Sequence, residues 1–209
     1  MIDRTILQRL PTLALAAYQR VNLNVLDIGA GVKASLIPIG DAMVVAIPGT
    51  DPRNWSDLLS DLRDVERYEC PSIGTVGKGP MMRAMNLWYI IKSQLPNSWY
   101  LTGHSLGGAV ALGIAALAVA EGRAPLHVMT FAAPLCLGRD AALAAARIDG
   151  LDFARYGDLV PMEPNLWWLS RPRQLTIIGS PVPLSQELDL LAHHAMAAYE
   201  IEARAFLGS

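Results

Sequence analysis

Residues 99–121 constrain the fold more than any other stretch of this chain, because they join a short apolar run directly to a long apolar one. The run from Trp99 to Thr102 has the length and composition of a buried strand. Leu106 to Glu121 has the length of a helix and is followed by Gly122, a common helix terminator. Only a Gly-His-Ser turn lies between the two. The stretch therefore predicts a strand that turns sharply into a helix.

Strand-like and helix-like segments alternate along the rest of the chain as well. Parallel strands need helical crossovers, so this order predicts an α/β fold with a mostly parallel central sheet covered by helices on both faces. The glycine-rich stretch at 71–80 is expected to be a loop. The expected strands are 33–39, 42–47, 99–102, 128–132, 153–156 and 174–178; the expected helices are an amphipathic N-terminal segment, 80–94, 106–121, 140–146 and 187–206.

Composition limits the classes of protein that remain. With 209 residues, 52% of them hydrophobic and 17% charged, residues 1–209 are expected to form one domain. A net charge of −2 without a basic stripe argues against a nucleic-acid partner. The longest apolar run is too short for a transmembrane helix, and the N-terminus lacks a secretory signal pattern. A location in the cytoplasm, or export by a signal-independent route, is therefore expected; oligomeric state stays open. Cys70 and Cys136 fit no metal motif and are expected to be unpaired thiols.

Ser105 is the candidate nucleophile. The pattern Gly103-x-Ser105-x-Gly107 matches the nucleophile elbow, in which a strained strand-to-helix turn presents a serine hydroxyl. The pattern alone is weak, but a strand before it and a helix after it are the context that the elbow requires. The alternative is that Ser105 merely caps the helix N-terminus with its side chain.

A serine nucleophile needs a base and an acid. Of the four histidines, His104 is expected to point away from the serine and His127 to be structural, which leaves His193 and His194. On sheets of this kind the chain order is serine, acid, histidine. Asp158 is favoured as the acid because it follows a predicted strand and a glycine. Asp189, one helical turn before His193, is interpreted as a solvated neighbour.

These segments together resemble the fungal-type class 3 lipase family, a branch of the α/β-hydrolases. The resemblance covers nearly the whole chain: "TGHSLGGAVA" is similar to the elbow of that family, "TFAAP" to its next strand, "GDLVP" to its acid segment and "HAMAAY" to its final motif. The resemblance places the acid at Asp158. It also selects His194 over His193, a choice that the chemistry of the residues leaves open.

The resemblance implies an oxyanion hole as well. "VVAIPGTDPRNWSDLLSDL" is similar to the family's oxyanion strand end and the segment after it, which places Thr50 as one donor and the backbone N–H of Leu106 as the other. The chain departs from the family at Ile47-Pro48, where the family has Phe-Arg and where the arginine would brace the loop. A second departure is "GKGPMM" at 77–82.

Two further segments could contact an acyl chain. In the resembled family a mobile helix covers the groove, and Trp55, Leu58 and Leu59 lie on one face of a predicted helix at 54–62. A surface helix packed on the core explains them equally well. Trp167 and Trp168 could border the groove or contact a lipid interface, or could simply pack.

The resemblance implies a serine hydrolase that cleaves carboxylic esters, with lipid-like substrates and transient contact with a lipid interface. The triad would be Ser105, Asp158 and His194, and no metal or cofactor is implied. Other enzymes with the same residues would be phospholipases, thioesterases or acyltransferases. The alternative from a different class is a catalytically silent, lipase-like interaction module.

Overall fold

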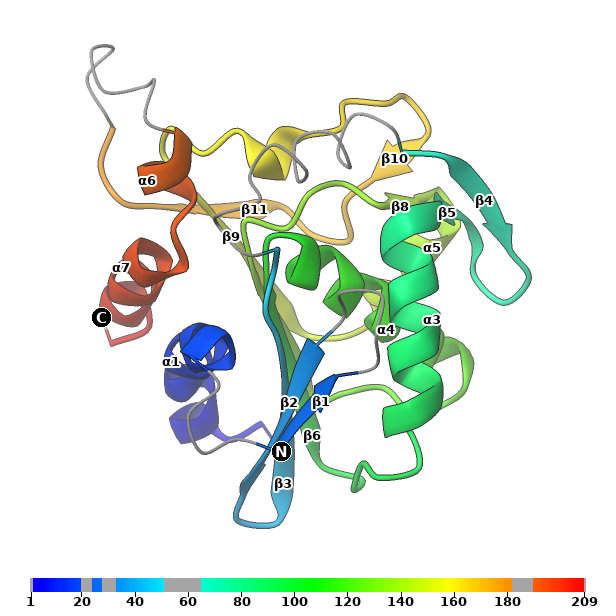
Figure 1. Cartoon of the computed structure of the whole chain (residues 1–209), viewed down its shortest axis with the longest axis horizontal. Coiled ribbons are helices and arrows are strands. Elements are labelled where there is room, and N and C mark those ends of the chain that lie inside the picture. Colours follow the sequence, from blue (N-terminus) through cyan, green and yellow to red (C-terminus); the bar gives the residue numbers. More distant parts are fainter. Residues whose placement is uncertain (1, 20–23, 28–32, 51–64, 182–189, 209) are drawn as a thin grey trace.

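In the computed structural model, a seven-stranded sheet forms the centre of the protein and helices cover both of its faces (Figure 1). The structure describes residues 2–19, 24–27, 33–50, 65–181 and 190–208. The strand order is β1-β2-β3-β6-β7-β9-β11. From β3 to β11 all neighbouring strands are parallel, whereas β1 and β2 form an antiparallel edge. The prediction of a mostly parallel sheet is therefore confirmed.

The central strands are buried along their whole length, which is why they are encoded as continuous apolar runs. Their carboxyl ends meet at one edge of the sheet, where the loops that follow them converge. The strands of this sheet are β1 (Asn24–Asp27), β2 (Lys33–Ile39), β3 (Ala42–Ile47), β6 (Trp99–His104), β7 (His127–Phe131), β9 (Gly150–Arg155) and β11 (Leu175–Ile178).

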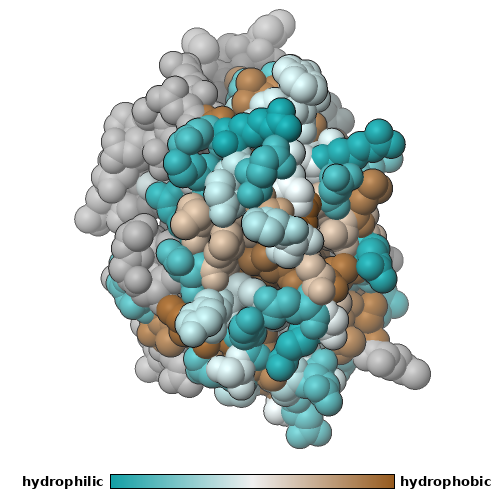
Figure 2. Space-filling view, turned by 90° about the vertical axis from the view of Figure 1, so that its right-hand side faces the viewer, coloured by the Kyte–Doolittle hydropathy of each residue, from teal (hydrophilic) through white to brown (hydrophobic). Residues whose placement is uncertain are grey.

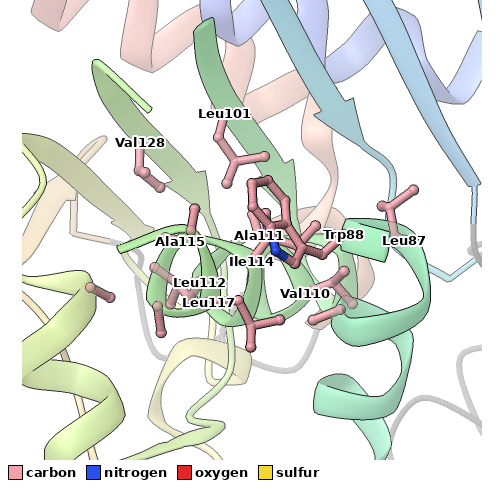
Figure 3. Close-up of a cluster of buried hydrophobic side chains, with 14 of the residues drawn as sticks. Leu87, Trp88, Leu101, Val110, Ala111, Leu112, Ile114, Ala115, Leu117 and Val128 are labelled. Atoms are coloured by element: carbon pink, nitrogen blue, oxygen red, sulfur yellow. The ribbon is translucent and has the colours of Figure 1, made fainter. Parts of the chain in front are cut away.

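Two hydrophobic cores hold the helices to the two faces. Helices α1 (Arg4–Gln19) and α7 (Met196–Gly208) pack on one face with Leu10, Phe131 and Tyr199 in their core. On the other face, Leu87, Leu101 and Ile114 belong to a larger core beneath three helices (Figure 3). These helices are α3 (Lys78–Ile91), α4 (Leu106–Ala120) and α5 (Arg139–Ala145); the shorter helices are α6 (Leu190–His194) and the 3-10 helix η2 (Val160–Met162).

Helix α4 is buried on every side from Gly107 to Ala118. It lies against the sheet between α3 and α5, so it has no solvent face and needs no polar stripe (Figure 1). Its apolar sequence follows from this central position. Because α4 begins directly after β6, the residue between them is fixed by two of the most buried elements of the fold.

The loop predicted at 71–80 was wrong in part. Residues Gly74–Gly77 form β5, which pairs antiparallel with β4 (Arg67–Cys70) and contacts β8 (Leu137–Gly138). Together with β10 (Leu169–Ser170) they make a second, four-stranded sheet. The glycines concealed this strand, which forms a hairpin with β4 and has one pair with the more distant β8. Helix α3 follows at once from Lys78, two residues before its predicted start.

The single helix predicted over 187–206 was also wrong, since the described residues form α6 and α7 with a break at Ala195. The carbonyl of His194 accepts a hydrogen bond from His104 Nε2 at 2.8 Å. The N–H of Ala198 bonds to Ala195 instead of to His194, which tightens the first turn of α7. A tertiary contact thus takes the carbonyl that a continuous helix would have used.

Polar and apolar side chains are intermixed on the face that carries α3 and β4 (Figure 2). Helix α3 exposes Met82, Tyr89 and Ile90 there. None of the described helices combines the length and the apolar character needed to cross a bilayer.

Both cysteines are free, as predicted, and both are buried. Burial raises the pKa of Cys136 to about 12. A thiol this basic stays protonated at neutral pH.

Candidate active site

Ser105 occupies a strained turn between β6 and α4. Its φ of 55° and ψ of −130° lie in a region that residues with a Cβ seldom adopt, and the residue is 1% exposed. The main chain maintains this conformation: the N–H of Ser105 donates to Phe131 O at 2.8 Å, and its carbonyl accepts from the N–H of Gly108 and Ala109. The side chain makes no capping hydrogen bond, so the helix-cap alternative is wrong. Among the described residues, Oγ has no hydrogen-bond partner.

The end of β3 lies directly against this turn. A Cβ on Gly107 would collide with the backbone oxygens of Ile47 and Pro48, so only glycine allows the contact. A Cβ on Gly49 would lie 2.7 Å from the Cβ of Ser105. These two close approaches bring the residue before Thr50 up against the serine. Leu106 begins α4, where the first N–H groups of a helix have no intrahelical acceptor.

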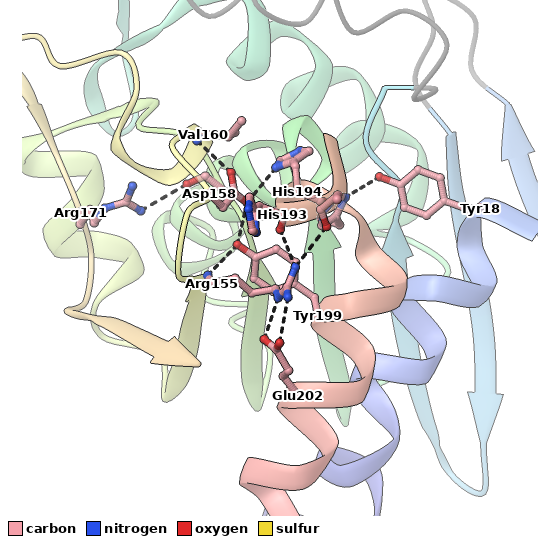
Figure 4. A network of polar contacts seen from close by, with 12 residues as sticks. Tyr18, Arg155, Asp158, Val160, Arg171, His193, His194, Tyr199 and Glu202 are labelled. Carbon is pink, nitrogen blue, oxygen red and sulfur yellow. Dashed lines mark hydrogen bonds and ion pairs between the residues drawn. The ribbon is translucent and has the colours of Figure 1, made fainter. Parts of the chain in front are cut away.

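Asp158 and His194 meet in a buried hydrogen bond (Figure 4). His194 Nδ1 lies 2.9 Å from Asp158 Oδ2, and because a carboxylate only accepts, Nδ1 carries the proton. Tyr199 O–H donates to the same oxygen at 2.7 Å, and the N–H of Val160 donates to Oδ1 at 3.0 Å. Three donors thus orient the carboxylate of Asp158. The other ring nitrogen of His194, Nε2, is also buried.

Tyr199 was not predicted as a site residue. The tyrosine in "HAMAAY" was a feature of the resemblance, but the sequence assigns no contact to it. In the structure its oxygen accepts the N–H of Arg155 at 2.9 Å while its proton goes to Asp158. Burial, reinforced by the charge of Asp158, raises the pKa of Tyr199 well above 10. Tyr199 therefore remains a hydrogen-bond donor at any pH at which the protein works.

Arg155 anchors the segment that carries the two histidines. Its guanidinium binds both oxygens of Glu202 at 2.7 and 2.8 Å, and it donates to the carbonyls of Ala192 and His193 at 3.2 and 2.9 Å (Figure 4). The ion pair with Glu202 raises the pKa of Arg155. A cation at the last carbonyls of a short helix also opposes the negative end of its dipole. The end of α6 is thereby tied to the end of β9.

His104 was expected to point away from the serine, and among the described residues its ring makes no hydrogen bond to Ser105 and lies against His194. The two rings lie 4.7 Å apart between centroids, and His104 Nε2 binds the His194 carbonyl. Its Nδ1 lies 2.6 Å from the hydroxyl of Tyr18 on α1. Burial, with the adjacent His194 as a further cause, lowers the pKa of His104 well below 6.5. His104 is therefore neutral at physiological pH.

We expect the protein to lose stability as the pH falls below 6.5. In the unfolded protein His104 takes up a proton in that range, whereas the folded ring resists protonation. The unfolded state therefore binds more protons, and the free energy of unfolding decreases. Burial lowers the pKa of His127 in the same direction. The urea midpoint should drop between pH 7.5 and pH 5.5 in the native protein and drop less in His104→Gln. An equal drop in both proteins would contradict this assignment.

The remaining predicted residues are placed less closely. Trp167 is 88% exposed, which is inconsistent with simple packing, and Trp168 is half-buried. Both line a shallow depression of about 320 Å³ formed by Arg67, Thr75, Arg139, Asp140, Trp167, Trp168 and Ser170. None of these is a candidate catalytic residue, so a role in an acyl groove stays a prediction. Trp55, Leu58 and Leu59, like Asp189, lie outside the described residues.

The described part of the chain holds no cluster of three or more His, Cys, Asp or Glu side chains that could bind a metal.

Comparison with known proteins assigns the chain to one family. The model of the lipase (class 3) family matches residues 44–167, more than half of the chain. The match includes Thr50, Ser105 and Asp158 but ends before His194, whose place in the site therefore rests on its contacts. No curated protein sequence matches the chain.

Several solved lipase structures share the fold. The Lip2 lipase from Yarrowia lipolytica superposes with a TM-score of 0.69 at 17% identity, over 92% of this chain and 93% of that one. The triacylglyceride lipase of Rhizomucor miehei gives 0.64 at 18% identity, over 85% and 82% of the two chains. The lipase from Rhizopus microsporus var. chinensis gives 0.64 at 14% identity, over 93% and 82%. At these identities the likeness shows the α/β-hydrolase fold alone.

Proposed function

Because the chain belongs to the class 3 lipase family, and is thereby a carboxylic ester hydrolase, we propose that it cleaves lipid-like esters through a triad of Ser105, Asp158 and His194. The observation that carries the proposal is the buried 2.9 Å hydrogen bond between Asp158 and His194 Nδ1; the carbonyl of His194 is in turn bonded to His104, the residue before Ser105. A histidine held in this tautomer has Nε2 available as a base. A carboxylate behind it stabilises the cation that forms.

In the first half of the reaction, Ser105 Oγ attacks the ester carbonyl carbon and its proton passes to His194 Nε2. The carbonyl oxygen gains the negative charge and accepts hydrogen bonds from the backbone N–H groups of Thr50 and Leu106 and from the Thr50 hydroxyl. Each such donor contributes about 10²- to 10³-fold in rate. The intermediate then collapses, the bond to the alcohol breaks, and His194 returns its proton to the leaving oxygen.

In the second half, water takes the place of the alcohol. His194 accepts a proton from the water as its oxygen attacks the acyl carbon, and the collapse of the second intermediate releases the carboxylic acid and regenerates the Ser105 hydroxyl. Asp158 accepts the hydrogen bond from Nδ1–H throughout and stabilises the imidazolium. Every proton is thus accounted for by residues of this chain and the substrate.

Exposed apolar side chains next to Asp158 support a lipid-like substrate. Leu159, Met162 and Trp167 all follow the acid within ten residues and are 59%, 50% and 88% exposed. Apolar groups at the rim of a site can enter a lipid surface, and tryptophan favours such interfaces. We place transient interface contact on this segment.

The function is tested by labelling and by a substrate panel. A fluorophosphonate should modify Ser105, as located by peptide mapping, and the protein should hydrolyse p-nitrophenyl esters and an emulsified triglyceride. Rates that rise when an interface is present would support a lipase over a simple esterase. Thioester or acyl-transfer products would redirect the substrate assignment, whereas a folded protein that neither labels nor hydrolyses any ester would favour a silent binding module.

A further inference from the structure

We propose that Tyr18 and His104 form a positioning relay, which fixes the turn at Gly49 and Thr50 relative to the proposed catalytic histidine, His194. The relay rests on the proposed function, since it acts through His194 and Thr50. It runs through three consecutive hydrogen bonds: Gly49 N to Tyr18 Oη at 2.7 Å, Tyr18 Oη to His104 Nδ1 at 2.6 Å, and His104 Nε2 to His194 O at 2.8 Å.

The direction of each bond follows from its acceptor. A backbone carbonyl only accepts, so His104 Nε2 must donate to His194. In a neutral ring Nδ1 is then an acceptor, and the Tyr18 hydroxyl donates to it. The Tyr18 oxygen in turn accepts the N–H of Gly49. The bond from the Tyr18 hydroxyl to Nδ1 runs in this direction only when His104 is neutral, the form that its burial favours.

The relay connects parts of the site that are distant in sequence. Gly49 precedes Thr50, and His104 precedes Ser105. The side chain of Tyr18 therefore bonds to the main chain next to Thr50, and the side chain of His104 bonds to the main chain of the proposed base, His194. The contact at Gly49 is close: a Cβ there would lie 2.7 Å from both the Ser105 Cβ and the Tyr18 oxygen. Gly49 follows Ile47-Pro48, and its N–H donates to the Tyr18 hydroxyl oxygen.

The ring of His104 also supports His194 by contact. Its centroid lies 4.7 Å from that of His194 and 5.7 Å from those of Tyr18 and Tyr199. Arg155 already binds the carbonyl of His193, and the relay adds a hydrogen bond to the next carbonyl, that of His194. A shift of about 1 Å in such a group costs up to about 100-fold in rate. Tyr18 and His104 are therefore positioning residues rather than catalytic ones.

Tyr18→Phe isolates the relay, because it removes one hydroxyl and keeps the ring. We expect kcat on p-nitrophenyl butyrate to fall about 10- to 100-fold with KM changed less than threefold. The pseudo-first-order rate constant for labelling of Ser105 by excess fluorophosphonate should fall by a similar factor; unlike the labelled amount, this constant does not depend on the fraction of the sample that is irreversibly inactive. His104→Gln retains an N–H donor for the His194 carbonyl and should keep more activity than His104→Leu.

Tyr100→Phe is the matched control. Its hydroxyl also binds the main chain near α1, accepting the N–H of Asp3 at 3.0 Å, but within the described part of the chain it has no hydrogen bond to a site residue. Both Phe variants should lose similar thermal stability, and only Tyr18→Phe should lose turnover. Equal labelling rates in the native protein and Tyr18→Phe, or equal losses of kcat in the two Phe variants, would overturn the relay. A native protein that does not label at all would instead overturn the proposed function.

Discussion

Ser105→Ala is expected to lower kcat for ester hydrolysis by about 10⁴-fold or more, because no other group in the site can form the acyl-enzyme. The turn itself should persist. The bonds that hold it, from Ser105 N–H to Phe131 O and from Gly108 N–H to Ser105 O, belong to the main chain. The measurement is steady-state turnover on p-nitrophenyl butyrate, together with the loss of fluorophosphonate labelling.

The same variant makes a stability prediction that separates a catalytic serine from a structural one. Ser105 Oγ is buried and has no partner among the described residues, and an unsatisfied buried polar group costs about 1–3 kcal/mol. Its removal should leave the free energy of unfolding unchanged or raise it. Ser35→Ala, at another buried serine, is the control and should retain full turnover. Turnover of Ser105→Ala within tenfold of the native value would rule out the proposed mechanism.

Asp158→Asn is expected to reduce kcat by about 10⁴-fold while KM changes little. The amide is nearly the same shape as the carboxylate, so the packing around it survives. It carries no charge to stabilise protonated His194, and its NH₂ group can force the wrong tautomer on the ring. The donors from Tyr199 and Val160 that now converge on the carboxylate would also face a neutral group.

Asp152→Asn provides the comparison for this variant. Asp152 is also buried, accepting from Thr130 Oγ1 at 2.6 Å and pairing with Arg173 at 3.1 Å, but it lies within β9 and, among the described residues, has no hydrogen bond to a site residue. Breaking a buried pair costs about 3–5 kcal/mol when one charge is deleted, so this variant should be the less stable one. Its kcat, normalised to labelled Ser105, should stay within twofold. A similar loss of kcat in both variants would mean that Asp158 acts through stability alone.

Much of the fold could be predicted because its signals are local. The alternation of apolar runs and helical stretches predicted the parallel sheet, and α4 was evident from its length and from Gly122. β5 was missed because its glycines indicate a loop, although most of its pairing is with the neighbouring β4 and only one pair joins it to the distant β8. The break at Ala195 could not be predicted, since the carbonyl before it binds Nε2 of His104, ninety residues away in the chain.

The candidate site likewise contains some residues that local sequence signals identify and others that only the packing of the elements brings together. Ser105 is encoded locally, by the glycines and by the strand and helix that flank it. Asp158 could be singled out by its place after a strand, but the choice of His194 over His193 came from the resemblance, and the structure adds the hydrogen bond to Asp158. The sequence offered no signal for Tyr18. It lies in a helix whose apolar pattern predicts only packing, and it reaches the site because α1 covers the sheet beside β3 and β6.

The sequence by itself determined the class of fold, the strained turn at Ser105 and the order of the three proposed catalytic groups, because each depends on residues that are neighbours in the chain or on a chain order common to such sheets. Only the tertiary structure decided which side chains hold those groups in place. Tyr199 on Asp158, Arg155 on the end of α6, and Tyr18 with His104 between Gly49 and His194 are contacts across different elements. Hydrogen bonds of this kind depend on distances of about 3 Å, which only the packing of the elements sets.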